Sequence, residues 1–194
     1  MFDVILKNIG KHITLSKEEE DYFTSKLVYE VYKKRDVVLE PGKVALYTYF
    51  VTDGCLKLYE YDNNGFENII TFVPKDWWNS DLYSFLTQQP ATQYLQAIEK
   101  TELLKLSKTD LEDLYVKIPK FERFFRILHQ NSHLALTNLV RNNSSLTAEE
   151  KYDKFVERYQ GLELRITQKD IAAYLGITPE FLSRIKRKRK KMDS

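Results

Sequence analysis

The stretch from residue 166 to residue 188, ITQKDIAAYLGITPEFLSRIKRK, predicts two short helices joined by a tight turn. Thr167 can cap the first helix, with an acidic residue three positions later in its first turn. Gly176 stands where that helix must end, because glycine adopts a positive φ without steric cost. Thr178 can cap the second helix, and Pro179 occupies its first position, where no N–H donor is needed. This order of residues is typical of a helix-turn-helix.

The second helix has an apolar inner side, formed by Leu182 and Ile185, and a largely polar outer side. A basic run, RIKRKRKK, starts at residue 184 and would be attracted to phosphates. The alternative is an amphipathic hairpin with merely solvated charges, but the caps, the glycine, the apolar side and the basic side occur together at the spacing of a recognition helix. The residues expected to contact DNA are Thr167, Gln168, Thr178, Glu180, Phe181, Ser183, Arg184, Lys186, Arg187 and Lys188.

Charge is unevenly distributed along the 194 residues. Residues 141–194 carry 13 Lys or Arg and 8 Asp or Glu, a net charge of +5, whereas residues 1–140 carry 17 and 20, a net charge of −3. A basic C-terminal third on an acidic body suits a nucleic-acid-binding module joined to another domain. The length is sufficient for two small domains.

Cysteine and histidine usage limits the chemistry that is expected. The single cysteine, Cys55, excludes a disulfide and a cysteine-ligated zinc or iron–sulfur site within one chain. His12, His129 and His133 are expected on helix surfaces rather than at a haem, and no His pair with nearby carboxylates lies on the expected strands. We therefore expect no metal, no cofactor and no enzymatic activity. No signal peptide or membrane span is evident, which predicts a cytoplasmic protein.

Residues 31–106 predict an antiparallel sandwich or β-roll. They are rich in β-branched and aromatic residues, which are grouped into short strands by frequent turn signals. One of these signals, Asn64-Gly65, is typical of a β-hairpin. Before this region, residues 1–30 are expected to be helical, with a capping box at residues 16–19.

A long helix is predicted from Pro119 to about residue 141. Along it, five residues step by 3, 4, 3 and 4, which is a heptad seam suited to dimerisation. These residues are Phe125, Leu128, Ser132, Ala135 and Leu139. The alternative is a helix that packs on its own β domain, as Phe121 and Phe124 can do. Residues 142–145 are expected to form a hinge, and another helix is expected over residues 147–159.

The order of β-roll, long helix, hinge, helix and helix-turn-helix resembles the Crp/Fnr family of bacterial transcription regulators over nearly the whole chain. Residues 51–59 are similar to the family's strand–turn–strand around a glycine, and residues 63–65 to its next hairpin. Residues 76–86 lie where the family has its phosphate-binding cassette, and residues 168–184 match its helix-turn-helix. The resemblance implies a homodimer on double-stranded DNA and no membrane partner, with RNA polymerase and a small-molecule effector as further candidate partners.

The cassette departs from that of the family's cyclic-nucleotide binders, which use a Gly-Glu pair and, about ten residues later, an Arg followed by Ser or Thr. Here these regions read NSD at residues 79–81 and PATQ at residues 90–93, and no Lys or Arg lies between Asp76 and Glu99. A buried cyclic phosphate would lack a cationic partner, so we expect no response to cyclic AMP. The residues that could line a pocket for another ligand, or else simply pack in the core, are Trp78, Asn79, Ser80, Asp81, Leu82, Thr92 and Tyr94.

The recognition helix departs from the family as well. Pro179 stands where the family often has a guanine-reading Arg, so that contact is lost. Glu180 and Arg184 match the family's other reading positions, where a carboxylate can accept from cytosine N4 and an arginine can pair with guanine O6 and N7. The chain ends soon after this helix, so we expect no full C-terminal wing, and the basic tail can take over its phosphate contacts.

We therefore expect an α+β protein. Its parts are a jelly-roll-like antiparallel β-roll of the cyclic-nucleotide-binding-domain type over residues 1–118, a dimerisation helix and hinge over 119–143, and a helix-turn-helix domain over 144–194. The expected function is that of a homodimeric, sequence-specific DNA-binding transcription regulator. The alternative is a ligand-sensing or protein-interaction module whose helix-turn-helix no longer reads DNA. A third interpretation, an enzyme on a cupin-like β-roll, would need a metal-ligand cluster.

Overall fold

The computed structural model describes residues 1–192, except for the side chains of residues 142–144 and 190–192. The described chain forms two compact units. Unit 1 comprises Met1–Leu58 and Phe72–His133, and unit 2 comprises Tyr59–Thr71 and the chain from Leu134 onward. The chain therefore passes between the units in a β-hairpin and again in the middle of a long helix. The domain boundaries expected at residues 118 and 143 stay a prediction.

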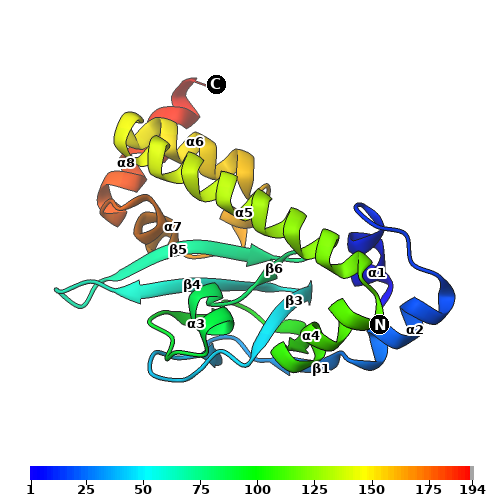
Figure 1. Ribbon diagram of the computed structural model, residues 1–194. Coiled ribbons are helices and arrows are strands. Elements are labelled where there is room, and N and C mark those ends of the chain that lie inside the picture. Colours follow the sequence, from blue (N-terminus) through cyan, green and yellow to red (C-terminus); the bar gives the residue numbers. More distant parts are fainter. Residues whose placement is uncertain (193–194) are drawn as a thin grey trace. The chain divides into compact units, whose positions relative to one another are not determined.

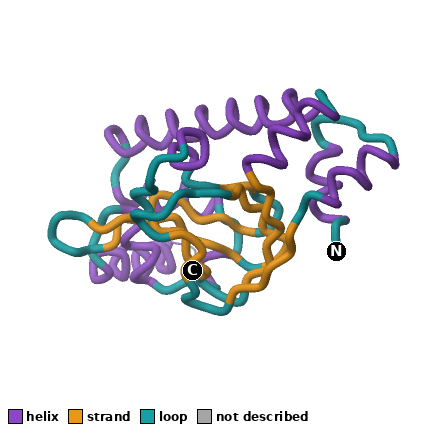
Figure 2. The backbone as a smooth tube through the Cα atoms, turned by 60° about the horizontal axis from the view of Figure 1, so that its bottom comes forward, coloured by secondary structure: helices purple, strands orange, loops and turns teal. Residues whose placement is uncertain are grey.

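The strands form two four-stranded sheets, drawn in orange in Figure 2. The first has the order β1 (Val28–Tyr32), β8 (Thr101–Ser107), β3 (Tyr47–Asp53) and β6 (Trp78–Asn79), with antiparallel pairs throughout. The second has the order β2 (Val37–Leu39), β7 (Tyr94–Ala97), β4 (Cys55–Tyr61) and β5 (Glu67–Pro74). Leu56, Leu95 and Leu103 are fully buried, one from each of three strands, so both sheets contribute to the core. The β-roll expected from the sequence is confirmed.

Gly54 fixes the turn between β3 and β4. Its φ is +85°, and a Cβ atom there would lie 2.5 Å from the backbone oxygen of Lys100. Thr101 supports the same turn, because its hydroxyl donates to the backbone oxygen of Cys55 at 3.1 Å and accepts from the backbone N–H of Cys55 at 3.2 Å. Glycine is thus required both by the backbone conformation and by the close approach of another strand. Cys55, which follows Gly54, is buried.

Short helices and the start of a long helix complete unit 1 (Figure 1). They are α1 (Asp3–Gly10), α2 (Lys17–Ser25), α3 (Leu82–Thr87), α4 (Lys108–Lys117) and the beginning of α5 (Lys120–Ser145). The predicted capping box starts α2: the Ser16 hydroxyl accepts from the Glu19 N–H at 3.2 Å, and the Glu19 carboxylate accepts from the Ser16 N–H at 2.7 Å. Helix was expected up to residue 30, but α2 ends at Ser25 and β1 begins at Val28, where a short run of valine and tyrosine starts.

The first turns of α5 contribute an aromatic cluster to the core of unit 1. Phe121, Phe124 and Phe125 are each at most 4% exposed. The Phe125 ring lies 5.4 Å from the Trp78 ring and 6.0 Å from the Tyr115 ring, edge-on in both cases. Phe125 therefore packs in the core of its own unit and is not available to a dimer seam, contrary to expectation. A spacing of three and four residues marks an apolar face but not the surface that covers it.

Unit 2 continues from the second half of α5. Its further elements are α6 (Ala148–Arg158), the 3-10 turn η1 (Leu162–Leu164), α7 (Gln168–Leu175) and α8 (Pro179–Met192). A hinge was expected over residues 142–145, but α5 runs on to Ser145, so Leu146 and Thr147 alone connect it to α6. Thr147 caps α6 through a capping box with Glu150, and the helix expected over residues 147–159 is observed as Ala148–Arg158.

An aromatic cluster forms the core of unit 2. The ring of Phe155 lies 5.4 Å from that of Tyr159 and 5.5 Å from that of Tyr174, and both Phe155 and Tyr159 are at most 2% exposed. The Tyr159 hydroxyl shares a 3.0 Å hydrogen bond with the hydroxyl of Thr71. This bond ties the hairpin segment Tyr59–Thr71 to α6 within unit 2.

Candidate nucleic-acid interface

The helix-turn-helix predicted from the sequence is formed by α7 and α8. The Thr167 hydroxyl accepts from the Asp170 N–H at 3.1 Å, and the Thr178 hydroxyl accepts from the Phe181 N–H at 3.2 Å, so each helix has its predicted cap. Gly176 ends α7 with a φ of +66°. The inward-facing side chains are each at most 6% exposed: Ile171, Ala172, Leu175, Leu182 and Ile185.

The outer side of α8 presents a stripe of charged side chains. Glu180, Arg184 and Arg187 are exposed, and their spacing of four and three residues places them on one face of the helix. The Arg184 guanidinium lies 5.1 Å over the ring of Phe181, a cation–π contact that holds its orientation. The contact between Phe181 and Arg184 is one that the sequence did not reveal. The other exposed members of the predicted set are Thr167, Gln168, Thr178, Phe181, Ser183 and Lys188.

The basic residues further along α8 are engaged within unit 2. The Lys188 ammonium contacts both carboxylate oxygens of Glu149 on α6, at 2.9 and 3.0 Å, and Arg189 pairs with Asp153 at 2.6 Å. Lys186 is half-buried and lies 5.9 Å over the ring of an α6 tyrosine. The phosphate contacts expected of the basic run that contains both residues stay a prediction. The structure continues α8 to Met192, which brings both side chains against α6.

In unit 1, a closed loop around Asp81 occupies the cassette region. Asp81 is only 5% exposed, and its carboxylate accepts from the N–H of Ser84 at 3.0 Å and from the N–H of Thr92 at 3.3 Å. The Ser84 hydroxyl donates to the backbone oxygen of Gln89 at 2.5 Å and accepts from the N–H of Ala45 at 2.9 Å. An anion placed here would compete for N–H groups that already bind a carboxylate, and that carboxylate would repel it.

The remaining candidate pocket residues have other contacts or lie near the surface. The Trp78 indole N–H donates to the side-chain oxygen of Asn8 at 3.2 Å, and its ring packs in the aromatic core. The Ser80 hydroxyl donates to the backbone oxygen of Tyr47 at 3.0 Å. For Trp78 the structure thus shows the core-packing alternative rather than a ligand contact. The others are half-buried or exposed: Asn79, Leu82, Thr92 and Tyr94.

The second half of α5 has two distinct apolar faces. Ala135 and Leu139, from the predicted seam, are half-buried and line a cavity against α6 and α7. Leu136 and Val140, one position further on in each case, are 54% and 63% exposed. One residue corresponds to about 100° around an α-helix, so the exposed pair forms a separate face. Sequence reasoning missed this pair, although its spacing of four residues was visible.

Residues 1–192, as far as the structure describes them, contain neither a metal-ligand cluster nor a membrane-spanning helix. Among the side chains that the structure describes there, no group of three or more His, Cys, Asp or Glu could hold a metal ion. No helix in that same part of the chain is both long enough and apolar enough to cross a membrane.

Comparison with known proteins agrees with this architecture. Residues 29–117 match the family model of the cyclic nucleotide-binding domain. The anaerobic regulatory protein of Haemophilus influenzae is 27% identical over 165 residues, which are 79% of this chain and 63% of that protein. The structure of FixK2 from Bradyrhizobium japonicum superposes with a TM-score of 0.77 at 18% identity, over 86% of both chains. A Crp/Fnr-family transcriptional regulator from Eubacterium rectale gives 0.71 at 16% identity, over 92% of this chain and 85% of that one.

The fold and the matched domain define a protein with a β-roll of the cyclic-nucleotide-binding type followed by a helix-turn-helix segment. The chain is similar to regulators of the Crp/Fnr family, as its resemblance in sequence indicated. It spans just under two thirds, 63%, of the length of the Haemophilus influenzae relative.

Proposed function

We propose that the chain is a homodimeric, sequence-specific DNA-binding transcription regulator that does not respond to cyclic AMP. The observation that carries the proposal is the exposed stripe of Glu180, Arg184 and Arg187 on the outer side of a fully capped helix-turn-helix. Such a stripe suits the major groove, where carboxylate and guanidinium groups discriminate between base edges. The regulatory relatives support the same function.

Titration of labelled duplex DNA with the protein, over a salt series, tests this function. We expect one duplex to bind more tightly than its scrambled version at every salt concentration, with log Kd rising linearly with log salt concentration as counterions are released. Equal and weak binding of both duplexes would contradict the proposal.

A second candidate function is an interaction module whose helix-turn-helix no longer reads DNA. The ion pairs of Lys188 with Glu149 and of Arg189 with Asp153 favour it, because they occupy two cations that phosphates would otherwise attract. The same titration separates the two functions. The interaction module predicts no sequence preference and only the weak, salt-sensitive affinity of any basic surface.

Assembly as a homodimer is proposed through the exposed face of α5 that carries Leu136 and Val140. Two large apolar side chains more than half exposed on one helical face are what an isologous interface would cover. Ser132, also exposed, lies about one turn before Leu136 and can continue this face. Leu128, by contrast, is half-buried in the described chain, so less of its side chain is accessible to a dimer interface than the sequence pattern implies.

Cyclic AMP and cyclic GMP are expected not to bind at micromolar concentration. The carboxylate of Asp81 already accepts the N–H groups of Ser84 and Thr92, and no Lys or Arg lies between residues 76 and 99. Isothermal titration calorimetry with each nucleotide should therefore give a Kd above about 10 μM, weaker than about −7 kcal/mol.

A tighter Kd for the unmodified chain would contradict this expectation. Asp81→Asn provides a matched variant, because asparagine retains a capping oxygen and removes the negative charge. It should also fail to bind, since a phosphate would still lack a cationic partner. Binding by this variant alone would show that the Asp81 charge is what excludes the nucleotide.

A further inference from the structure

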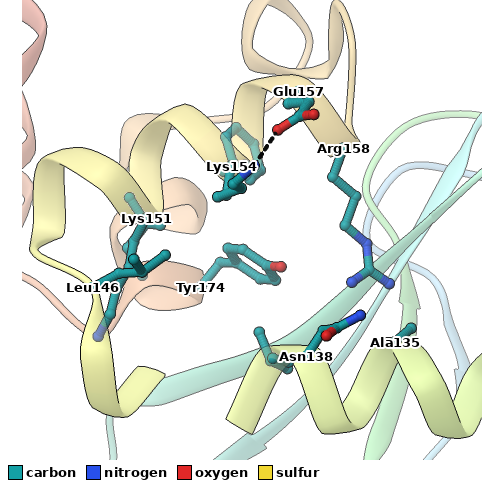
Figure 3. A pocket seen from close by; sticks show the side chains of 11 residues that line it. Ala135, Asn138, Leu146, Lys151, Lys154, Glu157, Arg158 and Tyr174 are labelled. Atoms are coloured by element: carbon teal, nitrogen blue, oxygen red, sulfur yellow. Dashed lines mark hydrogen bonds and ion pairs between the residues drawn. The ribbon is translucent and has the colours of Figure 1, made fainter. Parts of the chain in front are cut away.

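A cavity of about 450 Å³ opens in unit 2 between the second half of α5, helix α6 and the end of α7 (Figure 3). This volume lies in the range of roughly 300–1,000 Å³ that small-molecule sites occupy. Its apolar lining comes from all three helices and from the α5–α6 connection: Ala135, Leu139, Leu146, Phe155 and Leu175. A ligand with an apolar body could therefore be enclosed on several sides.

The polar lining of the cavity is predominantly cationic. Lys151, Lys154 and Arg158 come from successive turns of α6, and the one carboxylate that lines the cavity, that of Glu157, pairs with Lys154 at 2.8 Å. Three cations and one carboxylate leave a net lining charge of +2. Figure 3 shows the Arg158 guanidinium and the Lys151 side chain at opposite ends of the cavity, with the Tyr174 ring extending between them.

We propose that this cavity binds a small amphipathic anion, an organic carboxylate or phosphate ester with an apolar body. The guanidinium of Arg158 can hold the acidic group by charge-assisted hydrogen bonds, and Lys151 offers a second cation. The apolar body would lie against Leu139 and Phe155. The Tyr174 ring adds aromatic surface to the lining against which an apolar body can pack.

The site is compatible with the proposed dimer and reaches the helix-turn-helix. Ala135 and Leu139 line the cavity, whereas Leu136 and Val140 lie about 100° further round α5, so one face can bind the anion while the other pairs with a second copy. Leu175 is the last residue of α7 and directly precedes the turn into α8. An anion bound here would link the position of α7 to that of α5. The binding itself does not depend on the DNA-binding proposal.

The proposal is tested by titrating the full chain with 8-anilinonaphthalene-1-sulfonate, an aromatic anion whose fluorescence rises on binding. We expect saturation at one site per chain. The double variant Lys151→Gln/Arg158→Gln should bind the probe at least about tenfold more weakly, because it removes the charge-assisted hydrogen bond from Arg158 and the second cation of the lining. Lys169→Gln, an exposed α7 lysine outside the cavity, is the matched control and should stay within about twofold of the unmodified chain.

Displacement of the probe separates anion recognition from simple apolar binding. Naphthalene-1-carboxylate should displace it at least about tenfold better than the neutral naphthalene-1-carboxamide. The proposal is overturned if the carboxamide competes equally, or if Lys169→Gln weakens the probe as much as the double variant does. It is also overturned if the double variant, with an unchanged melting temperature, binds like the unmodified chain. If the double variant does not fold, the single variant Arg158→Gln replaces it, because the Arg158 side chain is exposed. This variant should bind the probe at least about threefold more weakly. Unchanged binding by Arg158→Gln overturns the proposal too.

Discussion

Replacing Leu136 and Val140 with glutamate is expected to yield monomers and to lower the affinity for a two-half-site duplex by about 10²–10⁴-fold. Both side chains are more than half exposed in the single chain, so the substitutions leave its core intact. In a dimer, however, they would bury unpaired carboxylates, which costs several kcal/mol per charge. Analytical ultracentrifugation reports the assembly state, and a titration with the two-half-site duplex reports the affinity.

Leu134→Glu is the matched control for this experiment. Leu134 is 61% exposed and lies two positions before Leu136, about 200° around the same helix. It should remain dimeric and bind DNA as before. If the Leu136/Val140 variant stays dimeric, the interface lies elsewhere, and Leu128 with Leu139 from the sequence-predicted seam would be the next pair to test.

Arg184→Ala is expected to weaken binding to the preferred duplex by about 1–3 kcal/mol and to relax discrimination at one base pair per half-site. The guanidinium is exposed on the outer stripe of α8 and is oriented by its contact with Phe181. An arginine in this setting can pair with guanine O6 and N7 in the major groove. Competition titrations on the preferred and scrambled duplexes measure both effects.

Lys188→Gln separates base reading from phosphate binding. Lys188 pairs with Glu149 in the free chain. To contact a DNA phosphate, its ammonium must leave the Glu149 carboxylate. The variant should weaken both duplexes alike, with a salt slope reduced by about one unit if the contact is made. If Arg184→Ala also weakens both duplexes equally, Arg184 binds phosphate, and base reading must rest on Glu180 or Phe181.

The helix-turn-helix could be predicted from local residues because its signals act within one or two turns of chain. The hydroxyls of Thr167 and Thr178 each accept a backbone N–H from three residues later, and Gly176 turns the backbone at its own position. The structure confirms all three. The β-roll was predictable for a related reason, since strand and turn residues alternate at short intervals. Its turn at Gly54 was visible in sequence, although the close approach of Lys100 that makes glycine obligatory there was not.

Interactions between distant segments could not be predicted in this way. The pattern that assigned Phe125 to a seam is the same whether the face is covered by a partner or by Trp78 of the same chain. The contact of Lys188 with Glu149 could not be predicted, because the basic run gave no sign that α8 would continue and meet α6. The cavity beside Arg158 depends on the packing of three helices, which no single stretch of sequence encodes.

Selection of bound sequences from a random duplex library, at physiological salt, tests the central claim most directly. A dimer that presents two copies of α8 should enrich a two-fold-symmetric site whose half-sites lie about one DNA turn apart, roughly 34 Å. Each half-site should contain the base pair at which Arg184→Ala loses discrimination. Recovery of no preferred sequence, or of a single asymmetric half-site, would contradict the claim that this chain is a dimeric reader of DNA sequence.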